Sequence, residues 1–152
     1  MTAPEPMKFS NAEHERAYHQ VAELIRGLYG KSAVPDSRNL PQFWIRSGSA
    51  DVMVAVMPAG DKNSSVWIQS WVNNGAEPSK EYYQFLLRAN YDLRFGGFFI
   101  DDKGGTGFSY HFPSSGLNEA TLSWAINAIA TTADDYDDKI ASQFGGQRPG
   151  VR

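Results

Sequence analysis

The residue types that most often do chemistry in proteins are sparse and scattered in this chain. His14 and His19 lie five residues apart in a segment expected to be helical. That spacing places them about 140° apart around the helix axis, too far for one metal ion to bind both. His111 stands alone in an expected strand. We therefore expect surface or structural roles for the three histidines.

The remaining candidates also lack the context that a catalytic or ligand site requires. The chain has no cysteine, which excludes disulfides, thiol catalysis and cysteine-ligated metals. The glycine-rich segment 101–107 lacks the Gly-Lys-Ser/Thr ending of a phosphate loop, and Ser114 and Ser115 lack the G-x-S-x-G context of a nucleophile. Four aspartates lie too close together, without a central glycine or closing glutamate, for a calcium loop, and we predict that they form a solvated acidic helix face. They are Asp134, Asp135, Asp137 and Asp138.

The aromatic residues are the feature that points to a function. The chain has nine Phe, seven Tyr and four Trp, more than one small core comfortably absorbs. Trp67 and Trp71 share one face of an expected strand, about 13 Å apart. Tyr83 and Leu87 share the less buried side of an expected helix. The alternatives are ordinary core packing and a protein-binding or dimer interface, and we take these four residues as the candidate interface.

Composition and charge narrow the class of partner. The 152 residues fit one domain, and the formal net charge of −3, with no cluster of basic residues, argues against nucleic-acid binding. A basic patch that gathers Arg38, Arg46, Arg88 and Arg94 in space would reopen that possibility. No segment approaches the roughly 20 apolar residues of a membrane helix, and the first residues lack an apolar signal region. We predict a cytoplasmic protein without cofactor, metal or membrane partner.

Three helices are expected from apolar residues that recur every three or four positions. The first begins with a capping box at residues 10–13 and ends at Gly30. The second spans about 79–90 and carries apolar residues around more than one face. The third is capped by Asn118 and ends at Gly145 and Gly146.

Five strands are expected between these helices, at 43–45, 51–57, 65–72, 94–101 and 107–112. The last two flank a hairpin turn at 102–105. The second and third strands are apolar on both faces, which is unusual for a sheet with one wet side. The expected order is α-β-β-β-α-β-β-α, an α+β domain over residues 10–146. Residues 1–9 are expected to be disordered or extended, and 147–152 to form a frayed tail.

This order of elements resembles the type III secretion chaperone-like fold, and within it the YbjN-like family of bacterial proteins, cyanobacterial members included. The resemblance covers about residues 10–146 and rests on three segments: Leu86-Leu87-Arg88-Ala89-Asn90 ahead of Phe95-Gly96-Gly97-Phe98, the hairpin around Asp102 to Gly105, and the helix Leu122 to Phe144 with Ala133-Asp134-Asp135-Tyr136-Asp137 before Gly145-Gly146. The resemblance implies a curved antiparallel sheet packed with helices, commonly a homodimer, and it implies no catalytic residues.

Two functional hypotheses follow. The first is a non-enzymatic protein-binding module, chaperone-like or regulatory, that acts as a homodimer and holds an unidentified partner polypeptide. The alternative is a small-molecule-binding protein or an enzyme of unknown chemistry, with a groove lined by Tyr82, Tyr83 and Arg88. Sealed burial of Trp67, Trp71, Tyr83 and Leu87 inside one subunit would count against the first hypothesis.

Overall fold

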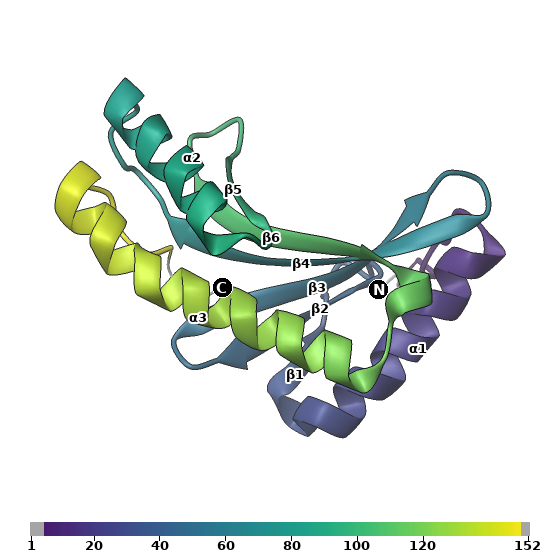
Figure 1. Cartoon of the computed structure of the whole chain (residues 1–152). Coiled ribbons are helices and arrows are strands. Elements are labelled where there is room, and N and C mark those ends of the chain that lie inside the picture. The colour runs from purple at the N-terminus through teal and green to yellow at the C-terminus, as the bar shows by residue number, and fades with distance from the viewer. Residues whose placement is uncertain (1–4, 150–152) are drawn as a thin grey trace.

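The computed structural model describes residues 5–149 as three α-helices and one six-stranded antiparallel sheet (Figure 1). The helices are α1 (Ala12–Tyr29), α2 (Lys80–Leu93) and α3 (Glu119–Phe144). The strands are β1 (Ala33–Pro35), β2 (Gln42–Ser47), β3 (Ala50–Ala59), β4 (Asn63–Asn73), β5 (Gly97–Ile100) and β6 (Thr106–Pro113), in the spatial order β1-β2-β3-β4-β6-β5. Short 3₁₀ turns, η1 (Gly30–Ser32) and η2 (Ser114–Gly116), follow α1 and precede α3. The predicted α+β class is confirmed.

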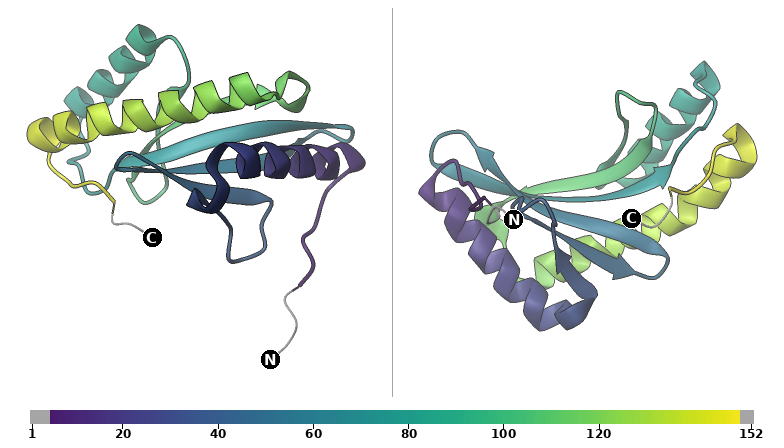
Figure 2. Two further views of the ribbon diagram at one scale, coloured as in Figure 1. Left: turned by 90° about the horizontal axis from the view of Figure 1, so that it is seen from below. Right: turned by 180° about the vertical axis from the view of Figure 1, so that it is seen from behind.

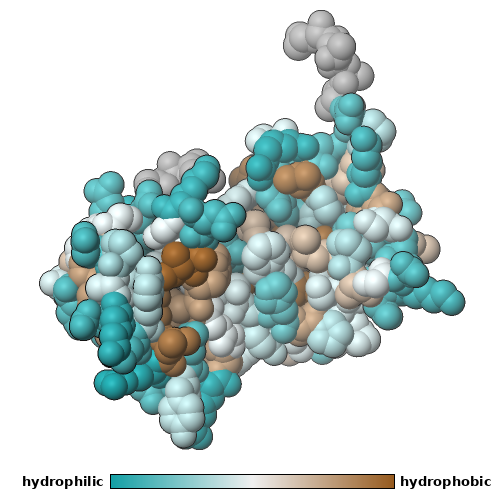
Figure 3. Space-filling model, turned by 90° about the horizontal axis from the view of Figure 1, so that it is seen from above, coloured by the Kyte–Doolittle hydropathy of each residue, from teal (hydrophilic) through white to brown (hydrophobic). Residues whose placement is uncertain are grey.

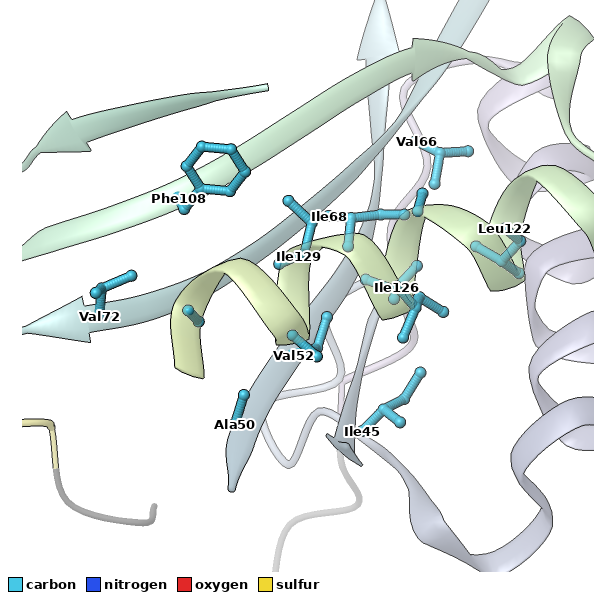
Figure 4. Packing of buried hydrophobic residues seen from close by; sticks show 14 of the residues in the cluster. Ile45, Ala50, Val52, Val66, Ile68, Val72, Phe108, Leu122, Ile126 and Ile129 are labelled. Carbon is cyan, nitrogen blue, oxygen red and sulfur yellow. The ribbon is translucent and has the colours of Figure 1, made fainter. Parts of the chain in front are cut away.

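The core lies between one face of the sheet and the helices. Strand residues alternate between faces, so Val52, Ile68 and Phe108 point to the same side and are fully buried there. They meet Ile126 and Ile129 of α3 (Figure 4). Helix α1 packs on β3 and β4, α3 crosses β3, β4 and β6, and α2 contacts β5. Figure 2 shows the long α3 lying along the sheet, with α2 beside its C-terminal half.

The helices begin where side chains can accept free backbone N–H groups. Asn11, Ser79 and Asn118 are the N-caps, and each side chain accepts a hydrogen bond from the third helical residue. The first cap is thus Asn11 rather than the predicted capping box at Ser10, whose backbone N–H instead donates to the His14 ring. The predicted helix ends at Gly30 and Gly145 are confirmed.

Two local differences from the sequence prediction concern the sheet edges. Strand β1 was not predicted, because three residues ending in Pro35 carry no strand pattern and pair only with β2. The strand expected at 94–101 begins at Gly97, because Arg94 adopts a left-handed conformation and caps α2. The predicted hairpin turn is confirmed, with the Asp101 side chain accepting the N–H of Gly105 at 2.7 Å.

The two predicted terminal segments lie partly outside the described residues, which exclude 1–4 and 150–152. At the C-terminal end, Gln147 forms an isolated antiparallel bridge with Asn74. The Asn73 side chain donates to the carbonyl of Gly145. These bonds direct the residues after α3 back across the end of the sheet. None of the helices within 5–149 has the length and hydropathy that crossing a membrane requires.

Candidate protein-binding surfaces

Helix α2 exposes a stripe of large apolar side chains. Tyr83, Leu87 and Tyr91 follow one another at intervals of four residues, and are 44%, 68% and 76% exposed. The opposite side of the helix is anchored in the core through Tyr82 and Leu86. The predicted excess of apolar surface on this helix is therefore real, and it faces outward.

The α2 stripe lies beside an edge of the sheet. Strand β5 is the last strand at this end, and its Ile100 is 37% exposed. Asn90 of α2 fixes the helix to β5, because its Oδ1 accepts the N–H of Phe98 at 2.6 Å. Apolar surface is visible at the α2 end of the molecule when it is seen from above (Figure 3). We call Tyr83, Leu87, Tyr91 and Ile100 the α2–β5 surface.

Trp67 and Trp71 lie on the other face of the sheet. Both are half-buried on β4, where Trp67 stacks on His111 with ring centroids 5.2 Å apart, and Trp71 meets the Phe99 ring at 5.4 Å. Between them lies Gln69, whose Oε1 is buried without a hydrogen-bond partner among the described residues, as is Trp67 Nε1. The four predicted interface residues thus occupy two separate surfaces, and the structure does not bring Trp67 and Trp71 together with Tyr83 and Leu87.

A cavity of about 510 Å³ opens where β2 turns into β3. Trp44 and Trp71 line it from the sheet, and Val34 from β1. The buried carboxylate of Asp36 accepts the indole N–H of Trp44 at 3.1 Å and holds that ring in place. Hydrogen bonds from Arg38 lower the pKa of Asp36 below its usual range, despite the opposing effect of burial. Sequence reasoning missed this cavity, because its walls come from segments distant in the chain.

Two aspartates of α3 reach the same cavity region and are not solvated as predicted. Asp137 is buried, and Asp134 is half-buried. Both accept hydrogen bonds or ion-pair contacts from the Arg148 guanidinium, with 3.0 Å between Arg148 Nη2 and Asp134 Oδ1. The prediction of a solvated acidic face was right for Asp135 and Asp138, which are exposed. It was wrong for Asp137, because the returning tail supplies a cation that covers it.

A second hollow of about 450 Å³ lies at the other end of the sheet, near the start of α1. Its polar groups satisfy one another: Ser64 Oγ donates to Ser114 Oγ at 2.8 Å, and Ser114 Oγ donates to Glu13 Oε1 at 3.0 Å. Hydrogen bonds from Arg16 and then Ser114 lower the pKa of Glu13 to about 2. This chain of bonds joins α1, β4 and η2, and we assign it a structural role.

The alternative predictions receive little support from the geometry. Tyr82 is fully buried and hydrogen-bonds Thr106, so it cannot line a groove with the exposed Tyr83. The four arginines named above do not gather. Arg38 and Arg46 line the cavity, each paired with an aspartate, whereas the other two lie on α2 and at its C-terminal end. Residues 5–149 contain no cluster of three metal-ligating side chains.

The described chain carries its helices on one face of an antiparallel sheet and leaves the apolar side of α2 exposed beside a sheet edge. Two solved structures share this fold. The ExsC-ExsE complex matches with a TM-score of 0.62 at 11% identity, over 84% of this chain and 95% of the other. The HopA1-SchA chaperone–effector complex matches with a TM-score of 0.59 at 14% identity, over 82% of this chain and 96% of the other. The chaperone-like fold expected from the sequence is confirmed.

The chain belongs to the YbjN family, as the sequence resemblance indicated. The family model, described as "Putative bacterial sensory transduction regulator", matches residues 40–142. No curated protein matches the chain at the level of sequence.

Proposed function

We propose that this protein is a non-enzymatic, cytoplasmic protein-binding module that acts as a homodimer and holds a partner polypeptide. Its family carries a regulatory description, and similar folds are seen in complexes of chaperones with their effectors. The solved complexes are formed by proteins that bind other proteins. The α2–β5 surface fits the same conclusion, because large apolar side chains are exposed there.

The single observation that carries the proposal is the α2–β5 surface. Three exposed apolar side chains at four-residue intervals are costly to leave in water, and interfaces are where Tyr and large aliphatic residues are best used. A two-fold dimer would place this stripe against the same stripe of a second copy, so each copy would bury the apolar side chains of the other. The partner polypeptide would then bind elsewhere on the dimer.

The proposal is tested by sedimentation velocity of the purified protein at micromolar concentration. We expect a dimer for the native sequence and a folded monomer for Leu87→Asp, because the new carboxylate would be buried unpaired at the interface. Val34→Asp is the matched control. Val34 is 57% exposed on β1, at the opposite edge of the sheet, so its variant should remain dimeric.

A native protein that sediments as a monomer would remove the homodimer from the proposal. If Leu87→Asp stays dimeric, the interface lies elsewhere. Partner holding is tested separately by affinity purification from the native host, with the Leu87→Asp variant in parallel. Absence of any co-purifying protein with the native chain would contradict a partner-holding role.

A further inference from the structure

We propose that the cavity between Trp44 and Trp71 recognises an arginine-bearing extended segment of the partner, and that Arg148 of the chain's own tail occupies the arginine position when no partner is bound. The proposal rests on the proposed function in that it takes the ligand to be a protein segment. It rests independently on the contacts that Arg148 makes.

The guanidinium of Arg148 is held by three groups that converge on one point. Nη2 donates to Asp134 Oδ1 at 3.0 Å and also contacts Asp137 Oδ2. Nη1 donates to the carbonyl oxygen of Ser49 at 3.2 Å. A planar, forked cation satisfies such a set, whereas the compact ammonium of lysine cannot reach all three groups in the same plane. The arrangement therefore favours arginine over lysine.

The acceptors that form this arginine position are built into rigid parts of the fold. Asp134 and Asp137 lie one turn apart on α3, and Ser49 lies in the β2–β3 turn. Ser49 Oγ donates to Asp134 Oδ1 at 2.7 Å, which fixes the carboxylate against the turn. Asp137 is only 6% exposed, and a buried carboxylate needs a cation to remain ionised at low cost. The acceptors are thus held in place by α3 and by the bond between Ser49 and Asp134.

Beside the arginine position, the cavity offers apolar walls for neighbouring residues of the ligand. Trp44 and Trp71 stand on β2 and β4, and Pro149, which follows Arg148, lines the same cavity. A volume of about 510 Å³ falls within the range of small ligand sites, roughly 300–1,000 Å³. The tail therefore shows, in the chain itself, the kind of segment that fits: an arginine followed by a proline.

The tail is the component that can exchange. The other cavity arginines pair with aspartates close in the chain: Arg38 with Asp36, and Arg46 of β2 with Asp51 of β3. Arg148 instead follows Gly145 and Gly146 near the end of the chain, where its segment is held by the bridge between Asn74 and Gln147 and by the bond from the Asn73 side chain to the Gly145 carbonyl. A segment near a chain end opens at lower free-energy cost than a core strand. Release of the tail removes the Arg148 contacts with Asp134 and Asp137, and an incoming arginine would restore them.

The test uses Arg148→Ala in the full chain and the peptide acetyl-Gly-Arg-Pro-Gly-amide as probe. Binding is followed by NMR through the indole signals of Trp44 and Trp71, with Trp124 on α3, which does not line the cavity, as internal reference. A site that the tail keeps about 90% or more occupied lowers the apparent affinity about tenfold or more. We therefore expect the peptide to bind Arg148→Ala at least about tenfold more tightly than the native protein.

Two controls establish that the cavity recognises the guanidinium. A peptide with citrulline in place of arginine has the same shape without the charge and should not bind. Adding Asp134→Asn to Arg148→Ala should abolish peptide binding while leaving the fold intact, since Asp134 is half-buried rather than sealed. If Arg148→Ala does not fold, Arg148→Lys keeps the charge beside Asp137 but loses the fork, and the peptide should still bind it more tightly than the native chain.

Equal peptide affinity for the native protein and the Arg148 variants would overturn the proposal, as would equal binding of the citrulline peptide. Neither result bears on the homodimer, whose test is the sedimentation of Leu87→Asp. Conversely, a monomeric native protein that still shows the arginine-dependent gain would retain the cavity and remove only the dimer.

Discussion

The carboxylate of Asp36 is the polar group on which the cavity wall most depends, and its removal has a calculable cost. Asp36 is 8% exposed and accepts five hydrogen bonds. Three come from Arg38, two from its side chain at 3.1 Å and one from its backbone N–H at 2.9 Å. The other two come from Gln42 Nε2 at 2.6 Å and Trp44 Nε1 at 3.1 Å. Substitution of Asp36 therefore leaves several donors unpaired at once.

The magnitude follows from how exposed each donor is. A hydrogen bond to a charged group contributes about 1.5–3 kcal/mol, and because Gln42 and Trp44 are half-buried donors we take the lower end of that range for each. The Arg38 side chain is 68% exposed, so its ion pair contributes at most about 1 kcal/mol. We expect Asp36→Ala to lower the free energy of unfolding by about 3–4 kcal/mol, and Asp36→Asn, which keeps the shape and one acceptor, by about 2 kcal/mol.

The effect has a defined pH dependence. The pKa of Asp36 in the folded protein lies below its ordinary value of 3.8, first because of the Arg38 side chain. A lowered pKa means that the carboxylate stabilises the fold above pH 3.8 and loses this contribution as the pH falls further. Urea unfolding at neutral pH and at successive lower values should therefore show the difference between the native chain and Asp36→Asn shrinking below 3.8.

Asp51→Asn is the matched control for this measurement. Asp51 also lines the cavity and pairs with Arg46 at 3.0 Å, but the two side chains are 34% and 46% exposed. An exposed pair of this kind contributes about 0–1 kcal/mol. If Asp36→Asn costs no more than Asp51→Asn, the reasoning from burial and donor number is refuted.

Further predictions concern three polar groups elsewhere in the fold. The Arg16 hydrogen bond lowers the pKa of Glu13 from 4.5 to about 2. The ionised Glu13 therefore stabilises the fold above pH 4.5, and this contribution is lost as the pH falls from 4.5 to about 2. The melting temperature of Glu13→Gln should fall less over this pH range than that of the native protein. Gln69→Met should leave the free energy of unfolding unchanged or raise it by about 1 kcal/mol, because it removes an unpaired buried oxygen. A decrease of more than about 1 kcal/mol would contradict this prediction. Asn90→Ala should cost about 1–3 kcal/mol and speed hydrogen exchange at the Phe98 amide, and unchanged exchange there would show that the bond is not formed in solution.

The regular elements of the fold were predictable because their local patterns agree with the tertiary structure. The alternation of Val52, Val54 and Val56 predicts a strand whatever its neighbours are, and all three are fully buried. Strand β1 and the left-handed Arg94 were not predictable. Pairing with β2 alone makes Ala33–Pro35 a strand, and arginine carries no preference for positive φ.

The candidate surfaces were predictable only in part. The spacing of Tyr83 and Leu87 correctly indicated the outer side of α2, since helical periodicity fixes which residues share a side. It could not show that α2 packs on the sheet face opposite to Trp67 and Trp71, because the side on which a helix docks is a tertiary property. The pairing of Asp137 with Arg148 depends on the path of the tail, and no residue pattern encodes that path.

The two edges of the sheet differ, and the difference limits what this protein can assemble into. One edge is the three-residue β1, which ends in Pro35 and so offers an incoming strand few hydrogen-bonding groups. The other edge, β5, is flanked by the apolar side of α2. Filament growth requires two different, complementary binding surfaces on each molecule. A symmetric contact between the same edge of two molecules leaves no such surface free for a third molecule. A dimer formed through the α2–β5 surface, as proposed, would therefore close on itself and would not extend into an open-ended polymer.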